Sequence, residues 1–543
     1  MNRLKTAGLA ALLVFAAGGA RAADLADCRD TAKPAAARIV ACGRVIDTAG
    51  ASEEDRAEAR VHRAAQLALD GKFREGLADV DAVLRIVPGD VDLLGLRAAI
   101  YYRMGDAAAA LRDARAALKA QPKHELALRI QAKAHYLAGD LARAEAGLRG
   151  LLKQVPNDAD AMEALAFVLN DLDRPEEAMP LLDAVLKGPE PTATAYYLRG
   201  ALLSAKDQAE RARADVDRAI EMDATDPRFF YLRGDMRFAA GDLAGALEAF
   251  RDGLKIAPKD PDLLAAEGVV LRDMQRADEG MKSFDAALAI DPTHRTALLS
   301  RARSWQESGE TEKMLADLRT ALATDPQSAD LHIQMALGYE FAGDLAAARR
   351  ELDASLRLEQ ANADALAQRG RVLHALEEDK AALADFQTAL KLAPTSAFAL
   401  QERARFYLDT SRPALAEADL EAALKVTPDN ASLLYDRSRA FLDQDRHDRA
   451  LKDLNLVIRL APETAIAHIQ KGYIYGELGD FTSALQALDA GLKLDPSYAK
   501  AFWWRAQAKA ALGDAAGARA DKAEALRLDP QAGENEKPVE ADA

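Results

Sequence analysis

The sequence has few of the residues on which most enzyme chemistry depends. Its 543 residues include two cysteines, eight histidines and three tryptophans, and only 6% of them are aromatic. The histidines are scattered, and His124-Glu125 is not followed by the second histidine that a zinc-binding helix needs. Neither a glycine-rich phosphate loop nor a Gly-x-Ser-x-Gly nucleophile turn occurs. We therefore predict a protein that is not an enzyme and that uses no metal and no cofactor.

An excess of positive charge is also missing. The chain has 71 lysines and arginines against 87 aspartates and glutamates, which gives a formal net charge of −16. No block of basic residues gathers positive charge on one segment, so we predict that nucleic acid is not a partner. Half of the residues are hydrophobic, a fraction typical of a folded chain rather than a disordered one.

A long hydrophobic run occurs only at the start of the chain. Arg3 and Lys5 precede an apolar stretch over residues 7–17, and the small residues Ala20 and Ala22 follow it. This pattern is typical of a secretory signal peptide, which we predict over residues 1–22. The next residue is Ala23 rather than a lipid-accepting cysteine, and no later segment is apolar enough to span a membrane. Together with the alanine-rich composition, the pattern predicts a soluble bacterial product that is periplasmic or secreted, with no transmembrane segment after cleavage.

The two cysteines, Cys28 and Cys42, lie shortly after the predicted cleavage site. In an oxidising compartment such a pair is most simply a disulfide. It would join a strand-like segment, ADLADCRD, to a helix predicted over residues 35–47, within an N-terminal cap over residues 23–56. Two free buried thiols are the alternative, and a metal site fits less well because no histidine or further cysteine lies close by.

The rest of the chain repeats every 34 residues. Steps of 34 from position 88 to position 530 reach proline in eleven of fourteen cases and leave no net insertion. This regularity predicts one continuous solenoid rather than several domains. The prolines are Pro88, Pro122, Pro156, Pro258, Pro292, Pro326, Pro394, Pro428, Pro462, Pro496 and Pro530.

Each repeat contains two apolar stretches of helical period separated by a short turn, often Gly-Asp as at Gly105-Asp106. Glycine ends a helix in a left-handed conformation and aspartate caps the next one, so each repeat is predicted to be a helical hairpin. When the proline is numbered 32 and the first repeat begins at Ala57, position eight is small in all fourteen repeats. Position twenty is small in all but one, where it is Met314. Small residues at two fixed places let paired helices approach closely.

These residues give the chain a resemblance to the tetratricopeptide repeat family: small residues at positions eight and twenty, apolar ones at four, eleven and twenty-four, and proline at thirty-two. The tryptophan usual at position four is replaced throughout. The resemblance covers residues 57–530 and implies an all-α fold, an α-solenoid superhelix of about fourteen hairpins, followed by a disordered tail over residues 531–543. It also implies that positions two, five, nine, twelve and thirteen of the first helices face an inner groove.

Position seven is arginine in nine repeats, and in eight of these an aspartate follows sixteen residues later, in the second helix. The repeats without the arginine never have the aspartate. We interpret these residues as ion pairs that join the two helices of one hairpin, because a guanidinium can hold a carboxylate with two bonds. The pairs are Arg63–Asp79, Arg97–Asp113, Arg199–Asp215, Arg301–Asp317, Arg369–Asp385, Arg403–Asp419, Arg437–Asp453 and Arg505–Asp521.

Two sets of groove residues are candidates for binding a partner. Arg371, Arg405 and Arg439 occupy position nine of consecutive repeats and could form a ladder for an acidic peptide. Alternatively, Arg405 and Arg439 pair along their own helices with Asp409 and Asp443, four residues on. The aromatic residues at groove positions could anchor a polypeptide or stack on sugar rings, or lie singly at the solvent edge. They are Tyr102, Tyr136, Tyr197, Tyr231, Phe238, Tyr435, Tyr473 and Trp503.

The sequence therefore predicts an exported, non-catalytic scaffold that binds a protein or peptide partner in its groove. The alternative is an accessory factor for the assembly or export of an envelope polysaccharide.

Overall fold

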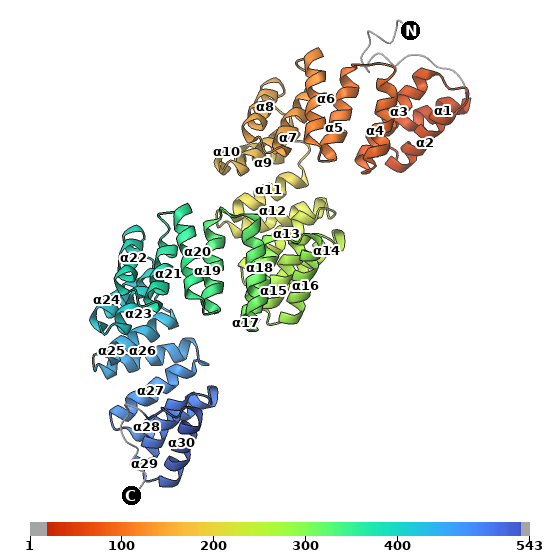
Figure 1. Ribbon diagram of the computed structural model, residues 1–543. Helices are drawn as coiled ribbons and strands as arrows, with labels where there is room; N and C mark the ends of the chain where they lie inside the picture. Colours follow the sequence, from red (N-terminus) through yellow and green to blue (C-terminus); the bar gives the residue numbers. More distant parts are fainter. Residues whose placement is uncertain (1–18, 534–543) are drawn as a thin grey trace. The chain divides into compact units, whose positions relative to one another are not determined.

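The computed structural model describes residues 19–533, and its only regular structure in that range is helical (Figure 1). The chain divides into two compact parts, and the boundary in the sequence lies between Met274 and Gln275. The N-terminal part contains α1 (Gly19–Arg29), α2 (Ala35–Asp47), α3 (Glu53–Leu69), α4 (Phe73–Leu84), α5 (Val91–Arg103), α6 (Ala107–Ala120), α7 (Glu125–Leu137), α8 (Leu141–Gln154), α9 (Ala159–Asp171), α10 (Pro175–Lys187), α11 (Ala193–Ser204), α12 (Ala209–Met222), α13 (Pro227–Ala239), α14 (Leu243–Ile256) and α15 (Pro261–Asp273).

The C-terminal part contains the other fifteen of the thirty helices in the described residues. They are α16 (Ala277–Ile290), α17 (Arg295–Glu307), α18 (Thr311–Thr324), α19 (Ala329–Phe341), α20 (Leu345–Leu358), α21 (Ala363–Ala375), α22 (Asp379–Leu392), α23 (Ala397–Asp409), α24 (Pro413–Val426), α25 (Ala431–Leu442), α26 (His447–Leu460), α27 (Ala465–Glu477), α28 (Phe481–Leu494), α29 (Ala499–Ala511) and α30 (Ala515–Leu528).

In both parts, consecutive helices pack in pairs, α3 with α4, α5 with α6 and so on, and each pair packs on the next. The predicted all-α solenoid of helical hairpins is thereby confirmed. Most of the predicted signal peptide, residues 1–18, and most of the predicted tail, residues 534–543, lie outside the described residues. No helix in residues 19–533 is long and apolar enough to cross a membrane.

The turn inside each hairpin has the geometry that the Gly-Asp motif predicts. Gly105 has a φ of 81°, a left-handed conformation that glycine adopts without strain. The side chain of Asp106 then caps α6 by accepting a hydrogen bond from the amide of Ala109 at 2.9 Å. Hairpins that lack glycine use a polar residue in the same left-handed conformation, as Asp173 does with a φ of 55°.

Close helix packing explains why position eight is small. A Cβ atom added to Gly234 would lie 2.5 Å from the ring of Phe250, and one added to Gly370 would lie 2.7 Å from Phe386. Both rings belong to the partner helix of the same hairpin and occupy the space beside the glycine. Where position eight is alanine it is buried, as Ala404 is.

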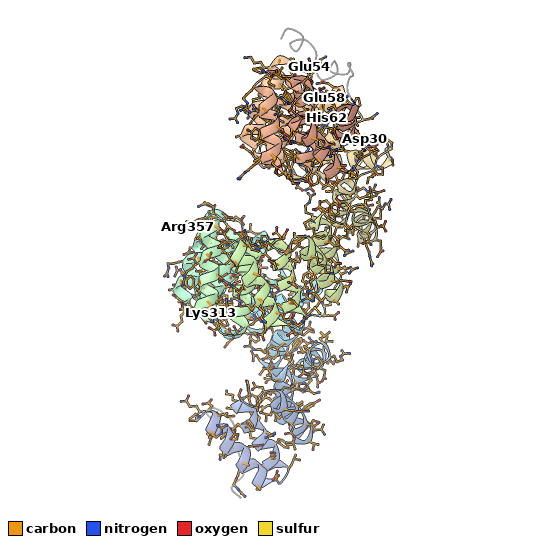
Figure 2. All side chains as sticks on the ribbon, turned by 90° about the vertical axis from the view of Figure 1, so that its right-hand side faces the viewer. Asp30, Glu54, Glu58, His62, Lys313 and Arg357 are labelled. Carbon is orange, nitrogen blue, oxygen red and sulfur yellow. A yellow bond between two sulfur atoms is a disulfide. The ribbon has the colours of Figure 1, made fainter. Side chains whose placement is uncertain are left out.

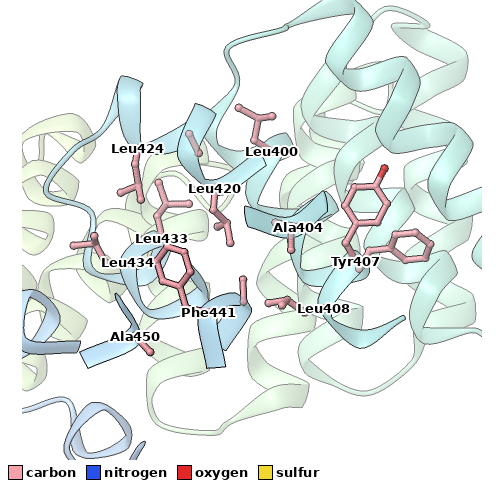
Figure 3. Close-up of a cluster of buried hydrophobic side chains, with 14 of the residues drawn as sticks. Leu400, Ala404, Tyr407, Leu408, Leu420, Leu424, Leu433, Leu434, Phe441 and Ala450 are labelled. Carbon is pink, nitrogen blue, oxygen red and sulfur yellow. The ribbon is translucent and has the colours of Figure 1, made fainter. Parts of the chain in front are cut away.

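The core runs from hairpin to hairpin rather than gathering at one centre. Figure 3 shows one such cluster around α23 to α26, in which Phe441 lies close to Leu433 and Leu420. The same cluster extends to Phe386 in α22 and to Ala467 in α27. Neighbouring hairpins therefore share apolar side chains, as expected for a solenoid.

The N-terminal helices α1 and α2 are joined by the predicted disulfide between Cys28 and Cys42. The cysteines pack with Ala41, Val45 and the α3 residue Ala59 in a small buried cluster. The expectation of a strand-like entry is wrong, because ADLADCRD lies almost entirely in α1. A segment of eight residues is too short for its pattern of apolar residues to distinguish a strand from a helix.

On α3, Glu54, Glu58 and His62 follow one another along one face, near Asp30 (Figure 2). They are four residues apart, so they lie on successive turns of the helix. Glu58 is bonded by Arg29 of α1, and the imidazole Nε2 of His62 lies 3.6 Å from the same carboxylate. This contact ties α1 to the first helix of the array.

Candidate functional site

Eight of the nine position-seven arginines bond the aspartates of their own hairpins through two parallel hydrogen bonds. Arg199 donates from Nε to Oδ2 of Asp215 at 2.7 Å and from Nη2 to Oδ1 at 2.8 Å. The Asp215 residue is 7% exposed. These charges hold two helices together, so they are not available to a ligand. The same two bonds form in Arg63–Asp79, Arg97–Asp113, Arg301–Asp317, Arg369–Asp385, Arg403–Asp419, Arg437–Asp453 and Arg505–Asp521.

Sequence reasoning missed a third hydrogen bond made by five of these arginines. The Nη1 atom of Arg199 donates to Asp183 of the preceding hairpin at 2.8 Å, and this bond joins a third helix. The signal was present, since these aspartates all lie sixteen residues before the arginine. The hydrogen bond to Asp215 raises the pKa of Arg199 above its ordinary value, and the bond to Asp183 adds a smaller rise. The equivalent bonds are Arg97–Asp81, Arg301–Asp285, Arg369–Asp353 and Arg505–Asp489.

The arginine ladder is occupied by carboxylates of neighbouring hairpins. Arg371 donates to Glu340 at 2.8 Å, Arg405 to Asp436 at 2.9 Å, and Arg439 to Asp409 at 3.4 Å. Arg405 thus bonds Asp436 of the next hairpin rather than Asp409 on its own helix, and Arg439 bonds Asp409 of the preceding hairpin rather than Asp443 on its own helix. The alternative pairing along each helix is not the one observed. The three arginine side chains are 35 to 38% exposed, so an acidic peptide would have to displace bonded carboxylates to reach them.

A buried carboxylate lies within this ladder. Glu402 of α23 accepts a hydrogen bond from Arg405 at 3.1 Å, and its Oε1 lies 3.9 Å from Arg371. Its side chain is 4% exposed. Burial raises the pKa of Glu402, although both arginines act in the opposite direction.

Four of the eight predicted groove aromatics, Tyr197, Tyr231, Tyr435 and Trp503, lie in different surroundings. The ring of Tyr197 lies 5.2 Å from that of Phe229, and Tyr231, which is 40% exposed, lies 5.7 Å from Phe250. Tyr435 is partly buried against the core, and burial raises its pKa to about 12. Tyr197 and Tyr231 belong to the N-terminal part of the chain, and Tyr435 belongs to the C-terminal part.

The fourth aromatic prediction is wrong, because Trp503 is buried rather than presented to a groove. The residue is 7% exposed. The chain after α30 lies against the indole so closely that a Cβ atom on Gly533 would be 2.4 Å from it. Lys522 of α30 covers the same ring, with its Nζ atom 5.7 Å from the ring centre. Trp503 is therefore a core residue of the last hairpin.

First helices of neighbouring hairpins form a cleft of about 240 Å³ in the N-terminal part. Apolar and aromatic side chains from α5, α7 and α9 make up much of its wall. Charged groups of both signs surround them. We define these residues as the first-helix cleft: Tyr102, Lys133, Tyr136, Leu148, Asp160, Glu163, Ala164, Phe167, Val168, Thr194 and Arg228.

Hydrogen bonds fix the polar groups of the first-helix cleft. Lys133 donates to Asp160 at 2.5 Å, so α7 and α9 are joined there. The hydroxyl of Tyr136 donates to Asp171 at 2.7 Å, and burial and this bond raise the pKa of Tyr136. The Glu163 carboxylate accepts a bond from Thr192, and burial raises its pKa.

Such a cleft can hold an apolar or aromatic side chain against Tyr102, Tyr136 and Phe167 while charged groups bond the backbone or polar side chains beside it. Tyr102 and Tyr136 were predicted as groove residues from their repeat position. Lys133, Glu163 and Phe167 were missed, because groove positions five and nine change residue type from repeat to repeat and give no periodic signal. Within residues 19–533, no group of three or more His, Cys, Asp or Glu side chains is arranged to hold a metal ion.

A second cleft, of about 260 Å³, lies between α27 and α29 in the C-terminal part. The rings of Tyr473 and Trp504 lie 4.7 Å apart in its wall. Glu477 and Gln507 add a carboxylate and an amide to the same wall. Of these residues, only Tyr473 was predicted as a groove aromatic.

Comparison with known proteins identifies the repeat. The sequence matches the tetratricopeptide repeat model over residues 96–159, 131–193, 197–261, 333–397, 402–465 and 469–533. No curated protein matches the sequence. Similar solved structures include the Cut9 and Hcn1 hetero-tetramer of the APC/C, which is 18% identical, with a TM-score of 0.46 over 81% of this chain and 94% of that one.

Two further structures are similar to a lower degree. The human IFIT1 dimer with PPP-AAAA is 18% identical, with a TM-score of 0.41 over 68% of this chain and 90% of that one. Yeast Tom70 is 17% identical, with a TM-score of 0.40 over 76% of this chain and 93% of that one. Tetratricopeptide arrays are usually non-catalytic scaffolds for protein–protein interaction. Since the matched segments cover more than half of the sequence, this chain belongs to the tetratricopeptide repeat family.

Proposed function

We propose that the protein is an exported, non-catalytic scaffold that binds an extended polypeptide segment of a partner protein in the first-helix cleft. The observation that carries this proposal is the cleft itself, about 240 Å³ in volume, where Tyr102, Tyr136 and Phe167 lie among charged groups. A partner would insert one aromatic or aliphatic side chain as an anchor.

The fixed geometry of the cleft supports binding without rearrangement. Lys133 is held by Asp160, and Tyr136 by Asp171, so these side chains are ordered before a ligand arrives. Preorganised side chains lose less conformational entropy on binding. Arg228, whose side chain is 54% exposed, lines the cleft and bonds Asp226, the N-cap residue of α13. Its charge remains within reach of a polar residue of the ligand.

Export is supported by the sequence pattern of residues 1–22 and by the Cys28–Cys42 disulfide, which needs an oxidising compartment. We place the mature protein in the periplasm of a bacterium or outside the cell. Expression of the full-length chain and of a chain that lacks residues 2–22 tests this placement. Recovery of the full-length product in the cytosolic fraction at its uncleaved mass would contradict export.

Selection from a library of random peptides tests the binding site. We expect the mature chain to select peptides with an aromatic or large aliphatic anchor. Replacing Phe167 with Ala should weaken the binding of the selected peptides about tenfold or more, as loss of an anchor contact does. Tyr231→Ala is the matched control, because Tyr231 is an exposed groove aromatic outside the cleft. An equal loss of peptide affinity in both variants would contradict the assignment of binding to this cleft.

The second cleft supports a second candidate function, the binding of an envelope polysaccharide during its assembly or export. Sugar rings pack on aromatic faces and their hydroxyls bond carboxylates and amides, and Tyr473, Trp504, Glu477 and Gln507 combine these groups. Retention of the mature chain on immobilised envelope glycan, lost in Trp504→Ala and kept in Phe167→Ala, would favour this function. If the glycan retains neither the mature chain nor Phe167→Ala, the polysaccharide-binding function is ruled out.

A further inference from the structure

One arginine of the nine at position seven departs from the pattern of the other eight. Sixteen residues after Arg233 the chain has Ala249 rather than aspartate, and Ala249 is fully buried. The guanidinium of Arg233 therefore lacks the carboxylate that its equivalents hold through Nε and Nη2.

The remaining contacts of Arg233 do not replace that carboxylate. Its Nη2 atom donates to Asp252 at 3.1 Å, and Asp252 also accepts a bond from Lys255 at 2.8 Å. Its Nε atom is buried and has no hydrogen-bond partner. The guanidinium lies over the ring of Phe230, 5.0 Å from the ring centre, which gives it no acceptor. A buried charged donor without an acceptor is unfavourable, so Arg233 is less completely bonded than its eight equivalents.

The other side of Arg233 faces the preceding hairpin. In five hairpins the Nη1 atom bonds an aspartate sixteen residues earlier in the chain. The equivalent residue here is Asp217, and among the described residues it makes no hydrogen bond or ion pair. Arg233 and Asp217 instead both line a cleft of about 150 Å³ between α12 and α13.

Two more arginines line the α12–α13 cleft. Arg213 is exposed and makes no hydrogen bond or ion pair within the described chain, while Arg237 donates to the carbonyl of Gly245 at 3.0 Å and to Glu248 at 3.3 Å. Val216 and Met236 give the cleft an apolar wall. Glu210, Asp217 and Asp242 are its acidic residues, and the carboxylate of Asp242 caps α14.

We propose that the α12–α13 cleft binds a carboxylate carried on a short aliphatic chain, which accepts hydrogen bonds from the side of the Arg233 guanidinium that faces α12, where its equivalents bond an aspartate through Nη1. The guanidinium fork suits a carboxylate, and Arg213 adds an uncommitted positive charge. The methylene groups of the ligand pack on Val216 and Met236. Such a carboxylate comes from a glutamate side chain of a partner protein or from a free short-chain acid. No residue of this cleft lines the first-helix cleft, so the inference stands apart from the proposed function.

Two probes and their neutral amides test the proposal on the mature full chain. The probes are the α-amide of N-acetylglutamate and hexanoate, and the amides are N-acetylglutamine amide and hexanamide. Titration by saturation-transfer NMR should show each acid binding about tenfold more tightly than its amide, the difference that charge-assisted hydrogen bonds provide. Tighter binding of the glutamate probe identifies a protein side chain as the source, and tighter binding of hexanoate identifies a free acid. Failure of both acids to bind, or equal binding of acids and amides, would overturn the proposal.

Three variants assign the binding to Arg233 and its cleft. Arg233→Gln removes the guanidinium and should weaken the binding of the acid probes about tenfold. Arg213→Gln, which removes an exposed positive charge, should weaken the binding of the acid probes about threefold without affecting folding. Arg218→Gln on the same helix is the matched control, because Arg218 bonds Glu221 and does not line the cleft. Unchanged binding in both of the first two variants would overturn the assignment.

Discussion

Arg199 and Asp215 face each other across the α11–α12 hairpin and are joined by two hydrogen bonds, of 2.7 and 2.8 Å. Asp183, from the preceding hairpin, bonds the third nitrogen of the same guanidinium at 2.8 Å. One side chain therefore connects three helices. The arrangement recurs in four more hairpins, so it links neighbouring repeats as well as the helices within one repeat.

We expect Asp215→Ala to lower the free energy of unfolding by about 2–4 kcal/mol, because Arg199 would lose its principal acceptor in a place with little solvent. The double variant Asp215→Ala with Arg199→Leu should lose less, since it leaves no unpaired charge. Chemical denaturation of the four proteins of this double-mutant cycle measures the coupling.

Arg303 and Glu307 supply the control for that cycle. This pair is four residues apart on α17 and separated by 3.5 Å, and its side chains are 67 and 54% exposed. Breaking it should cost no more than about 0.5 kcal/mol. A coupling energy for Arg199 and Asp215 as small as that of this pair would contradict a role in holding the hairpin.

Reduction of the Cys28–Cys42 disulfide should loosen the N-terminal helices and leave the rest of the chain folded. The bond closes a loop with a sequence separation of 14, for which chain-entropy estimates give about 3 kcal/mol. The cluster around it is small, so few apolar contacts replace the constraint. Hydrogen exchange should rise in α1 and α2 of a Cys28→Ser, Cys42→Ser variant.

Helices α23 to α26 serve as the internal reference for hydrogen exchange in that variant. They share a large apolar cluster that is remote in sequence from the cysteines. Equal acceleration in both regions would mean that the disulfide supports the whole chain, contrary to the expectation.

The helical hairpins could be predicted because their determinants are local and repeat. Gly105 and Asp106 specify a turn within a few residues, and the arginine and aspartate of each pair vary together between repeats. The buried position of Trp503 could not be predicted in this way. It depends on how the segment after the last helix lies on α29, and that segment has no equivalent in the other repeats.

The candidate site could be predicted only in part for a related reason. Tyr102 and Tyr136 share a repeat position, but a cleft depends on the sizes of neighbouring side chains and on the spacing of helices. Lys133 and Glu163 line it together with a small residue, Ala164. No one of these residues marks a site by itself, and their combination appears once rather than periodically.

Two glycines of α27 should respond in opposite ways to the same substitution. A Cβ atom on Gly472 would lie 2.5 Å from the side chain of Leu488 and 3.1 Å from its backbone nitrogen, so Gly472→Ala must push α28 away. We expect a loss of about 1–3 kcal/mol. Gly476 has no atom within 4 Å of its Cβ position, and Gly476→Ala should stabilise the helix by about 0.5–1 kcal/mol. Thermal unfolding measures both, and destabilisation by both would contradict the packing argument.

Glu402 should make the stability of the C-terminal part depend on pH. Burial raises the pKa of this carboxyl above its unfolded value of about 4.3, although Arg371 and Arg405 oppose the shift. The folded state then binds the proton more tightly than the unfolded state, so the contribution of Glu402 to stability falls as pH rises from the unfolded pKa through the folded pKa.

The variant Glu402→Gln lacks this titration. The free energy of unfolding of the variant, measured by urea denaturation at a series of pH values from about 4 upward, should therefore increase relative to that of the wild type as pH rises. A difference between the two proteins that stays constant across this range would show that Glu402 has the same pKa in both states. A difference that changes in the opposite direction would show that the bonds from Arg371 and Arg405 outweigh its burial.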